Sequence, residues 1–292
     1  MPFTPFPMSL LIRFQTFLGQ AAKKTLLRER PYVITVSGTV GKSSTKQAIA
    51  AVLAMEHARG QVRVSTKNYN NELGVPLTVF GHLAPGRSVL GWLKLLSTAF
   101  LTSIGVLSTK IQTFVFELGV DKPGDMQELA NLVTPDLVVI SALTPDDPTL
   151  APSHTANFGS IDKLIEEEAK IVNALRPQGT LVVNADDPRA YGLRHATTAH
   201  LLSFGETDAA DIRLAKTAVR CEEGTHGKVP VGLEITINVF HQPKQIYLPG
   251  VFGRSIAYAV CAGIAVATAL DLPLDEVCEN FAGYFKSLPG RT

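Results

Sequence analysis

Cysteine is scarce in this sequence, and its spacing excludes two classes of protein. Three cysteines occur among 292 residues, Cys221, Cys261 and Cys278. They lie far apart and lack the paired spacing of a zinc site or of a secreted disulfide framework. We therefore expect buried thiols in a cytoplasmic protein, where the redox environment is reducing.

An excess of charge of either sign is also missing. The chain has 27 Lys and Arg against 26 Asp and Glu, a formal net charge of +1. A field this weak neither attracts nucleic acid nor repels acidic substrates, so we expect no nucleic-acid partner. The sequence shows no internal repeat and no low-complexity tract. The function must therefore be inferred from local sites.

Unbroken apolar runs of membrane-spanning length are lacking too. Residues 88–107 are long enough, but Lys94 and several Ser and Thr residues interrupt them. Residues 1–30 lack the basic lead and cleavage site of a signal peptide, and their apolar residues recur at helical spacing. We expect both segments to be helices that pack on the domain, with peripheral membrane contact as the alternative.

Short apolar runs alternate with helical patterns along the rest of the chain. Runs rich in β-branched residues predict buried strands at 32–37, 62–66, 113–119, 136–142, 180–185 and 201–205. Helical patterns between several of them predict an α/β fold, a mostly parallel sheet with helices on both faces. Within 210–250 the pattern changes and predicts a small antiparallel segment, with strands at 233–240 and 244–250. Two helices are expected after it, near 253–270 and 273–286.

The stretch VSGTVGKSSTKQAIA, residues 36–50, places a glycine turn between an apolar run and a helical pattern. Backbone N–H groups of such a turn and of the helix start point at one spot, which suits a phosphate group. Gly38 and Gly41 enclose only Thr39 and Val40, two residues fewer than in the general P-loop. We nevertheless predict phosphate binding, because the physical arrangement is intact.

Three polar side chains follow the second glycine. Lys42 adds a point charge at the phosphate position, and Ser43 or Ser44 supplies the hydroxyl that a P-loop uses to hold Mg²⁺. The alternative is a purely structural glycine turn capped by serine. That alternative does not explain why a lysine directly precedes the two serines. The predicted nucleotide-binding loop is therefore Gly38, Thr39, Val40, Gly41, Lys42, Ser43 and Ser44.

The shortened loop resembles the GTxGK[ST] loop of the Mur ligases, ATP-dependent enzymes that build the peptide stem of bacterial cell-wall precursors. Further stretches resemble family motifs in order and spacing: NYNNELGVPLTVF (68–80), FELGVDKPGDM (116–126), HTANFGS (154–160), VVNADDP (182–188) and LPGR (288–291). The first two are most similar to the branch that adds D-alanyl-D-alanine. The resemblance covers about residues 31–291.

The resemblance implies a domain organisation. Residues 31–292 are similar to the P-loop NTPase-like central domain of the family, and residues 1–30 form an N-terminal helical segment. The family's N-terminal domain, which holds a UDP-sugar, and its C-terminal domain, which brings the amine, have no counterpart in the sequence. Closure normally completes such sites, so we expect this chain to bind nucleotide but to ligate poorly unless a separate chain supplies the missing domain.

The resemblance also implies a reaction that uses ATP and Mg²⁺. In the family a substrate carboxylate, here a UDP-muramyl peptide, attacks the γ-phosphate and forms an acyl phosphate and ADP. An amine such as D-alanyl-D-alanine then displaces phosphate and forms an amide. This phosphoryl transfer depends on positioning and charge neutralisation, for which the family uses a phosphate cradle, a lysine and metal ions.

Family positions for these roles match residues of this chain. Lys42 matches the lysine on the β- and γ-phosphates, while Ser43, Glu117 and His154 match Mg²⁺ ligands. Glu117 ends a predicted parallel strand, where such sheets bind ligands; a solvated loop acid is the alternative. His154 follows a longer connection than family members have, which favours a structural role more strongly at that position.

Three further residues match family positions near the nucleotide or the substrate. Asn184 and Asp187 align with residues beside the nucleotide, and Asn71 with one beside the phosphates and substrate. Asn184 is equally compatible with a turn cap after its strand. We include all three in the predicted nucleotide-binding set.

Two departures from the family pattern concern the mechanism. Family members often carry a lysine whose CO₂ adduct helps to hold a second Mg²⁺, and the aligned residue here is Glu168, in EEAKIV (167–172). We hypothesise that Glu168 supplies that negative charge; an exposed acid on a helix face is the alternative. Ser255 and Ile256 replace the family's nucleotide-contacting His and Asn, which implies weaker or rearranged adenine binding.

Two other functions remain open at this point. One is another ligase of the superfamily, joining glutamate to folate or building an amino-acid polymer as in cyanophycin synthesis; NYNNELGVP and KPGDM favour the cell-wall branch. The other is a catalytically silent nucleotide-binding or scaffold module, associated with a membrane through residues 1–30 and 88–107. A generic P-loop ATPase leaves the downstream motifs unexplained.

Overall fold

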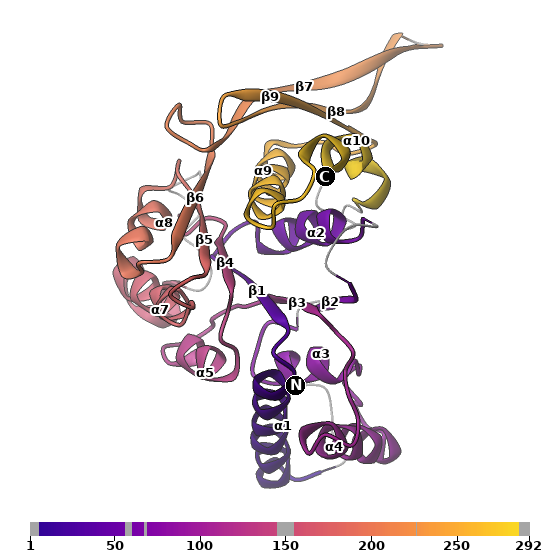
Figure 1. The fold of residues 1–292 in the computed structure, drawn as a ribbon, viewed down its shortest axis with the longest axis vertical. Helices are drawn as coiled ribbons and strands as arrows, with labels where there is room; N and C mark the ends of the chain where they lie inside the picture. The colour runs from indigo at the N-terminus through magenta and orange to yellow at the C-terminus, as the bar shows by residue number, and fades with distance from the viewer. Residues whose placement is uncertain (1–5, 56–59, 67–68, 145–154, 226, 286–292) are drawn as a thin grey trace.

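A nine-stranded sheet forms the centre of the molecule. The computed structural model describes residues 6–55, 60–66, 69–144, 155–225 and 227–285. The strands follow the order β2-β3-β1-β4-β5-β6-β7-β8-β9; neighbours are parallel as far as β7, and β7, β8 and β9 are antiparallel (Figure 1). Their bounds are β1 Tyr32–Ser37, β2 Val62–Val64, β3 Thr113–Glu117, β4 Leu137–Ile140, β5 Thr180–Asn184, β6 His200–Gly205, β7 Ile212–Gly224, β8 Gly227–Val239 and β9 Gln242–Pro249. The expected α/β class is confirmed.

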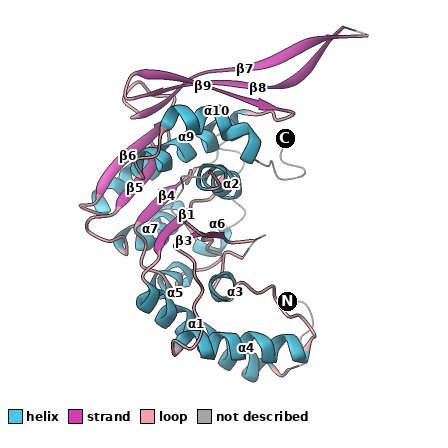
Figure 2. Ribbon diagram, turned by 45° about the vertical axis from the view of Figure 1, so that its right-hand side comes forward, coloured by secondary structure: helices cyan, strands magenta, loops and turns pink. Residues whose placement is uncertain are grey.

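Helices cover both faces of this sheet, as expected for parallel strands that are buried on both sides. Their bounds are α1 Met8–Glu29, α2 Lys42–Leu53, α3 Gly74–Phe80, α4 Val89–Ser103, α5 Asp125–Leu132, α6 Thr155–Phe158, α7 Ile161–Asn173, α8 Pro188–Gly192, a 3₁₀ turn Leu193–Ala196, α9 Arg254–Ala269 and α10 Leu274–Tyr284. Helices α2, α9 and α10 lie on one face, and α1, α3, α5 and α7 on the other (Figure 2).

The alternation of side chains along each strand divides the core into two clusters. On β1, Ile34 and Val36 join the cluster under α2 and α9, whereas Val33 joins the cluster under α1, α5 and α7. Gly263 of α9 faces Ala48 of α2, and a Cβ added at Gly263 would lie 3.1 Å from the Cβ of Ala48. The small residue lets these two helices pack closely over the sheet.

Strand β7 was not expected, and its position corrects one prediction about the cysteines. The outer half of β7 pairs with β8 in a hairpin that extends beyond the helices, so its residues are exposed. Cys221 lies on this hairpin and is exposed; the prediction that it is buried is wrong because no helix covers it. Cys261 on α9 and Cys278 on α10 are buried as expected, and burial raises the pKa of the Cys278 thiol to about 11.

Helices α1 and α4 form a lobe at the end of the molecule opposite the β7–β8 hairpin (Figure 1). The rings of Phe14 and Trp92 lie 5.7 Å apart between the two helices. The guanidinium of Arg28 donates to the carbonyl of Thr102 near the end of α4, which also accepts from the N–H of Gly105 at 3.1 Å. In the described part of the chain, no helix is both long and apolar enough to span a bilayer.

The strand order determines where a ligand site can form. From β1 the chain passes to β2 and β3 on one side of β1, and then to β4 on its other side. The carboxyl ends of β3, β1 and β4 therefore meet at the point where the order reverses, which is where open α/β sheets bind ligands. The glycine loop follows β1 at this edge.

Candidate functional site

The glycine loop is held against the end of β4. Gly38 has φ +123°, and a Cβ there would lie 2.6 Å from the hydroxyl of Ser141, so only glycine fits without a shift. Thr39 N–H donates to the carbonyl of Ala142 at 2.7 Å, and the Ser141 hydroxyl donates to the carbonyl of Val40 at 2.6 Å. These bonds fix the loop before any ligand is bound.

Helix α2 begins immediately after this loop without a side-chain cap. Its N-cap residue, Gly41, has no side chain to accept from the first-turn N–H groups. An anion at this position would accept from those groups and interact favourably with the helix dipole. Lys42 lies beside them, half-buried, with its ammonium 2.5 Å from the carbonyl of Gly38. Ser43 and Ser44 are buried in the first turn.

Glu117 ends β3 and meets the first turn of α2. The Ser43 hydroxyl donates to Oε1 of Glu117 at 2.8 Å, and the N–H of Glu117 donates to the Ser65 hydroxyl at 3.0 Å. Only 3 % of Glu117 is exposed. The alternative of a solvated loop acid is therefore wrong. A buried carboxylate beside a buried hydroxyl is a pair of hard oxygen donors, the type that Mg²⁺ prefers.

Lys46 is a site residue that the sequence interpretation missed. Its ammonium forms an ion pair with Oε2 of Glu117 at 2.7 Å. Both side chains are almost fully buried, at 3 % and 4 % exposed. The available signal was the spacing: Lys46 follows Lys42 by four residues, so the two lie on the same face of α2.

We expect Lys46→Met to lower the free energy of unfolding of the ligand-free protein by about 3–5 kcal/mol, because it leaves the Glu117 carboxylate buried and unpaired. Urea titration at neutral pH measures this loss. The matched control is the double variant Lys46→Met with Glu117→Gln, which removes both charges and should recover most of the lost stability. A double variant no more stable than the single one would contradict the ion pair.

Glu168 is buried next to the glycine loop, and only 1 % of the residue is exposed. Its Oε2 accepts from the Ser37 hydroxyl at 2.6 Å. The alternative of an exposed helix acid is therefore wrong. Burial raises the pKa of Glu168, although the Ser37 hydroxyl, the Lys42 charge and the Gly38 N–H oppose that rise.

This shift predicts a specific pH dependence of stability. A glutamate whose folded pKa is raised above its unfolded value stabilises the fold most at low pH, and this contribution is lost as the pH rises from the ordinary value of 4.5 through the folded pKa. We expect Glu168→Gln to remove that decline, so that its stability relative to the unsubstituted protein increases with pH. Urea titrations across this range, without Mg²⁺ or nucleotide, measure the difference.

The control is Glu166→Gln, which removes an exposed carboxylate from the same helix. Parallel pH profiles for Glu168→Gln and the unsubstituted protein would show that Glu168 does not titrate across this range.

Asn184 and Asp187 serve the local backbone at the end of β5. Asn184 Oδ1 accepts from the N–H of Asp186 at 3.0 Å. Its side chain thus caps the turn after β5, which was the alternative to a nucleotide contact. Asp187 Oδ2 accepts from the N–H groups of Leu143 and Thr144 at 2.6 and 2.8 Å, and its Oδ1 caps α8. Burial alone would raise the pKa of Asp187, but these bonds outweigh it and lower the pKa.

The segment before α3 lies beside the end of β3. The carbonyl of Asn70 accepts from the N–H of Gly119 at 3.0 Å, and a Cβ at Gly119 would lie 2.6 Å from the Asn70 amide nitrogen. Asn71 Oδ1 accepts from the N–H of Gly74 at 3.0 Å, so its side chain caps the start of α3. Asn70, which sequence reasoning did not select, is thus adjacent to the Glu117 strand. His154 lies outside the described residues.

The start of α9, where Ser255 and Ile256 lie, contains a charged network. The guanidinium of Arg254 forms a paired contact with Glu206, at 2.9 Å to each carboxylate oxygen. The Tyr258 hydroxyl donates to Asp186 at 2.7 Å. Ile256 is 2 % exposed and joins the hydrophobic core. Its side chain is therefore not available to a ligand.

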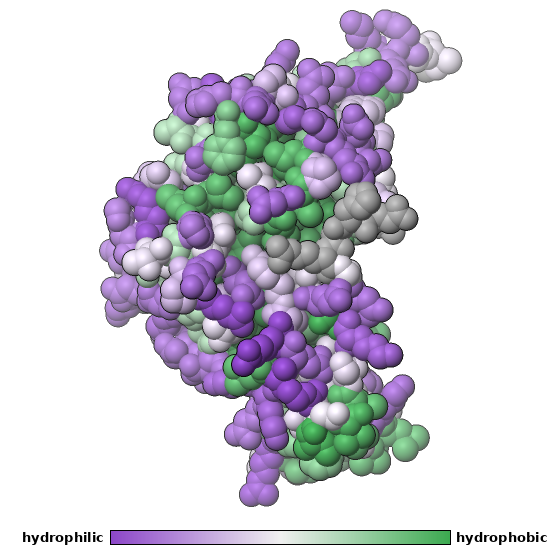
Figure 3. Space-filling view, in the orientation of Figure 1, coloured by the Kyte–Doolittle hydropathy of each residue, from purple (hydrophilic) through white to green (hydrophobic). Residues whose placement is uncertain are grey.

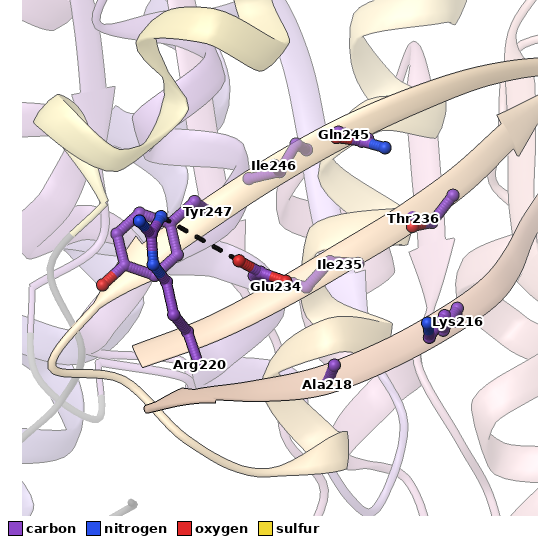
Figure 4. A pocket seen from close by; sticks show the side chains of 9 residues that line it. All are labelled: Lys216, Ala218, Arg220, Glu234, Ile235, Thr236, Gln245, Ile246 and Tyr247. Atoms are coloured by element: carbon purple, nitrogen blue, oxygen red, sulfur yellow. Dashed lines mark ion pairs between the residues drawn. The ribbon is translucent and has the colours of Figure 1, made fainter. Parts of the chain in front are cut away.

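A hollow of about 350 Å³ lies on the antiparallel strands, away from the glycine loop (Figure 4). Arg220 and Glu234 form an ion pair of 3.9 Å in its lining, and both side chains are about half exposed. The guanidinium of Arg220 also lies 4.9 Å from the ring centre of Tyr247. Exposed pairs of this kind are weak, so the hollow offers no chemistry comparable to the loop.

The described residues fit a single Mg²⁺ position best at Ser43 and Glu117. Among these residues, no three His, Cys, Asp or Glu side chains cluster as a metal site. Oxygen donors from one hydroxyl and one carboxylate suit an ion that keeps several waters and binds phosphate oxygens. The Lys46 ammonium contacts the same carboxylate, so the charge of Glu117 is already partly balanced.

A parallel sheet, a glycine loop after its first strand and a carboxylate at the end of the adjacent strand define a nucleotide-binding α/β domain. The model of the family described as the Mur ligase middle domain matches residues 97–267, more than half of the chain. The chain belongs to this family, which confirms the resemblance inferred from its motifs.

Similar proteins include a curated ligase and two solved structures that share the fold. UDP-N-acetylmuramoyl-tripeptide–D-alanyl-D-alanine ligase of Bacillus subtilis is 27 % identical over 268 residues, which are 92 % of this chain and 48 % of the relative. Crystal structure I of MurF from Acinetobacter baumannii has a TM-score of 0.71 at 21 % identity, covering 94 % of this chain and 50 % of that one. MurF ligase from Thermotoga maritima in complex with ADP has a TM-score of 0.69 at 19 % identity, covering 95 % and 53 %. The chain thus spans about half the length of the relatives it matches.

Proposed function

We propose that this chain is the nucleotide-binding part of an ATP-dependent amide-forming ligase of cell-wall precursor synthesis. The observation that carries the proposal is the Ser43–Glu117 contact of 2.8 Å beside the uncapped start of α2. It combines a phosphate cradle with oxygen donors for Mg²⁺. The names of the relatives support a UDP-muramyl tripeptide as the carboxylate substrate and D-alanyl-D-alanine as the amine. The requirement for ATP is consistent with a cytoplasmic location.

The side chains of the site would divide the work of binding. The N–H groups of the first turn of α2 would hold the phosphates, and Lys42 would leave the Gly38 carbonyl to contact them. Ser43 and Glu117 would hold Mg²⁺, with His154 as a further ligand. ATP would supply the γ-phosphate for an acyl phosphate, and Mg²⁺ would neutralise its charge.

The supporting side chains would keep this arrangement in place. Lys46 would fix the Glu117 carboxylate from the opposite side, at 2.7 Å. Asp187 would hold residues 143–144 close to the glycine loop through two backbone bonds. Because reacting groups must be positioned within fractions of an ångström, such positioning residues affect the rate without touching the substrate.

Amide formation would also depend on the parts of the relatives that this chain does not match, supplied by the same polypeptide or by a separate one. Exclusion of water from an acyl phosphate needs closure over the site. We therefore propose nucleotide binding as the property of this chain, and amide formation as the property of the completed enzyme.

We expect Lys42→Ala to weaken Mg²⁺-dependent ATP binding by roughly ten- to a hundredfold, the effect of losing one charge-assisted contact. Isothermal titration calorimetry on the 292-residue chain measures this difference. Lys23→Ala, which removes an exposed lysine of α1, is the control and should bind ATP like the unsubstituted chain. Equal affinities for all three proteins would exclude the loop as the phosphate site.

A role for Glu168 in holding the second metal predicts a second result. Glu168→Gln should raise the Mg²⁺ concentration needed for half-maximal ATP turnover by roughly tenfold, as loss of a metal-orienting group does. The measurement titrates Mg²⁺ on the completed enzyme with a carboxylate substrate, and Glu166→Gln is the control. An unchanged Mg²⁺ requirement would mean that Glu168 serves only to hold the loop.

A further inference from the structure

The outer side of α4 exposes an apolar stripe that is interrupted by the exposed Ser97. Leu90, Leu93, Phe100 and Ile104 are separated by three, seven and four residues, so they lie along one side of the helix. Their exposed fractions run from 48 % to 79 %. Val106 and Leu107 are exposed just beyond the helix. Figure 3 shows a hydrophobic patch at the end of the molecule where Figure 1 places α4.

The stripe is part of a rigid surface, because the opposite side of α4 is buried. Trp92, Leu95 and Ala99 are at most 4 % exposed and pack in the same core cluster as α1. The indole N–H of Trp92 donates to the carbonyl of Gly86 at 3.1 Å. The stripe therefore exists as a preformed face and does not depend on ordering a flexible segment.

The lobe that carries the stripe is strongly basic, and the one acidic residue in 6–29 and 81–112, Glu29 at the end of α1, forms an ion pair with Arg28. Residues 6–28 contribute four Lys and Arg, residues 81–112 contribute three, and neither range contains Asp or Glu. Three exposed basic residues lie close to the stripe in sequence. Arg87 precedes it, Lys94 lies within it and Lys110 comes after it. The rest of the chain has an excess of acidic residues, so the positive charge is concentrated at this end.

We propose that this face of α4 binds the surface of a membrane that contains anionic lipid. An apolar stripe lying in the plane of the interface, with lysine and arginine beside it, combines insertion at the acyl boundary with attraction to anionic headgroups. A second copy of the chain fits less well, because pairing the face with itself would oppose like charges, and Glu29 is already paired with Arg28 of its own chain. The proposal is independent of the nucleotide site.

Sedimentation of the full chain with vesicles tests this proposal. We expect strong binding to phosphatidylcholine vesicles that contain phosphatidylglycerol, weak binding to phosphatidylcholine alone, and loss of the difference at high salt. The double variant Leu90→Glu with Leu93→Glu should reduce partitioning by at least about tenfold. Lys94→Glu should weaken binding to anionic vesicles by at least about fivefold and leave binding to neutral vesicles unchanged.

The matched control introduces the same chemical change elsewhere. Val219→Glu with Val229→Glu alters two valines of the distant β7–β8 hairpin that are about half exposed, and it should bind vesicles like the unsubstituted chain. Trp92 is the single tryptophan and lies between α4 and α1, so an unchanged emission spectrum shows that each variant keeps the lobe folded.

Three results would overturn the proposal. The first is no binding of the unsubstituted chain to anionic vesicles. The second is binding that the leucine variant retains in full, which would mean adsorption by charge alone. The third is a dimer in sedimentation equilibrium that the leucine variant dissociates, which would identify the stripe as an interface between copies.

Discussion

The buried contact of Glu117 with two side chains of α2 is the constraint on which the site depends. Ser43 and Lys46 reach the two carboxylate oxygens from successive turns of one helix, at 2.8 and 2.7 Å. This double contact fixes the rotation of α2 relative to β3, and therefore the direction of the N–H groups at the start of α2. A buried carboxylate without these partners would cost several kcal/mol. The same side chains thus stabilise the fold and orient the phosphate cradle.

A second buried acid, Glu168, lies next to the glycine loop. Glu168 accepts from the hydroxyl of Ser37, the last residue of β1, at 2.6 Å. Because the loop begins at the next residue, this bond fixes the backbone where the strand passes into the loop. Lys42 lies close enough for its charge to oppose the rise in the pKa of Glu168. The site therefore holds two lysines and two acids in a small volume, and each acid has a hydrogen-bond donor.

Strand positions and the loop could be predicted from sequence because they depend on local patterns. The strand expected at 32–37 is observed as Tyr32–Ser37, and the glycine turn follows it as expected. Lys46 was missed because a lysine on a helix is usually solvated, and only the packing of β3 against α2 buries it. Strand β7 was missed because its outer half is polar and pairs only with β8, so no apolar alternation marks it.

Long-range contacts also explain why sequence reasoning selected Asn71 but not Asn70. Asn71 is engaged locally, where its side chain accepts from the N–H of Gly74 three residues away. Asn70 contacts Gly119, which is distant in sequence and adjacent only in the folded sheet. Motif spacing cannot distinguish these roles, since both residues belong to the same short segment.

The segment that begins with Tyr69 and Asn70 connects the candidate site to the α4 lobe. Asn70 contacts the backbone beyond Glu117, while the hydroxyl of the preceding Tyr69 accepts from the N–H of Ala84 at 2.9 Å, just before α4. Helix α3 lies between these contacts and is entirely buried. Close-packed elements of this kind move as a unit, because interiors have few voids to absorb a shift. Packed elements therefore join the site to the lobe of α4, so a surface that holds α4 would bear on the orientation of the nucleotide site.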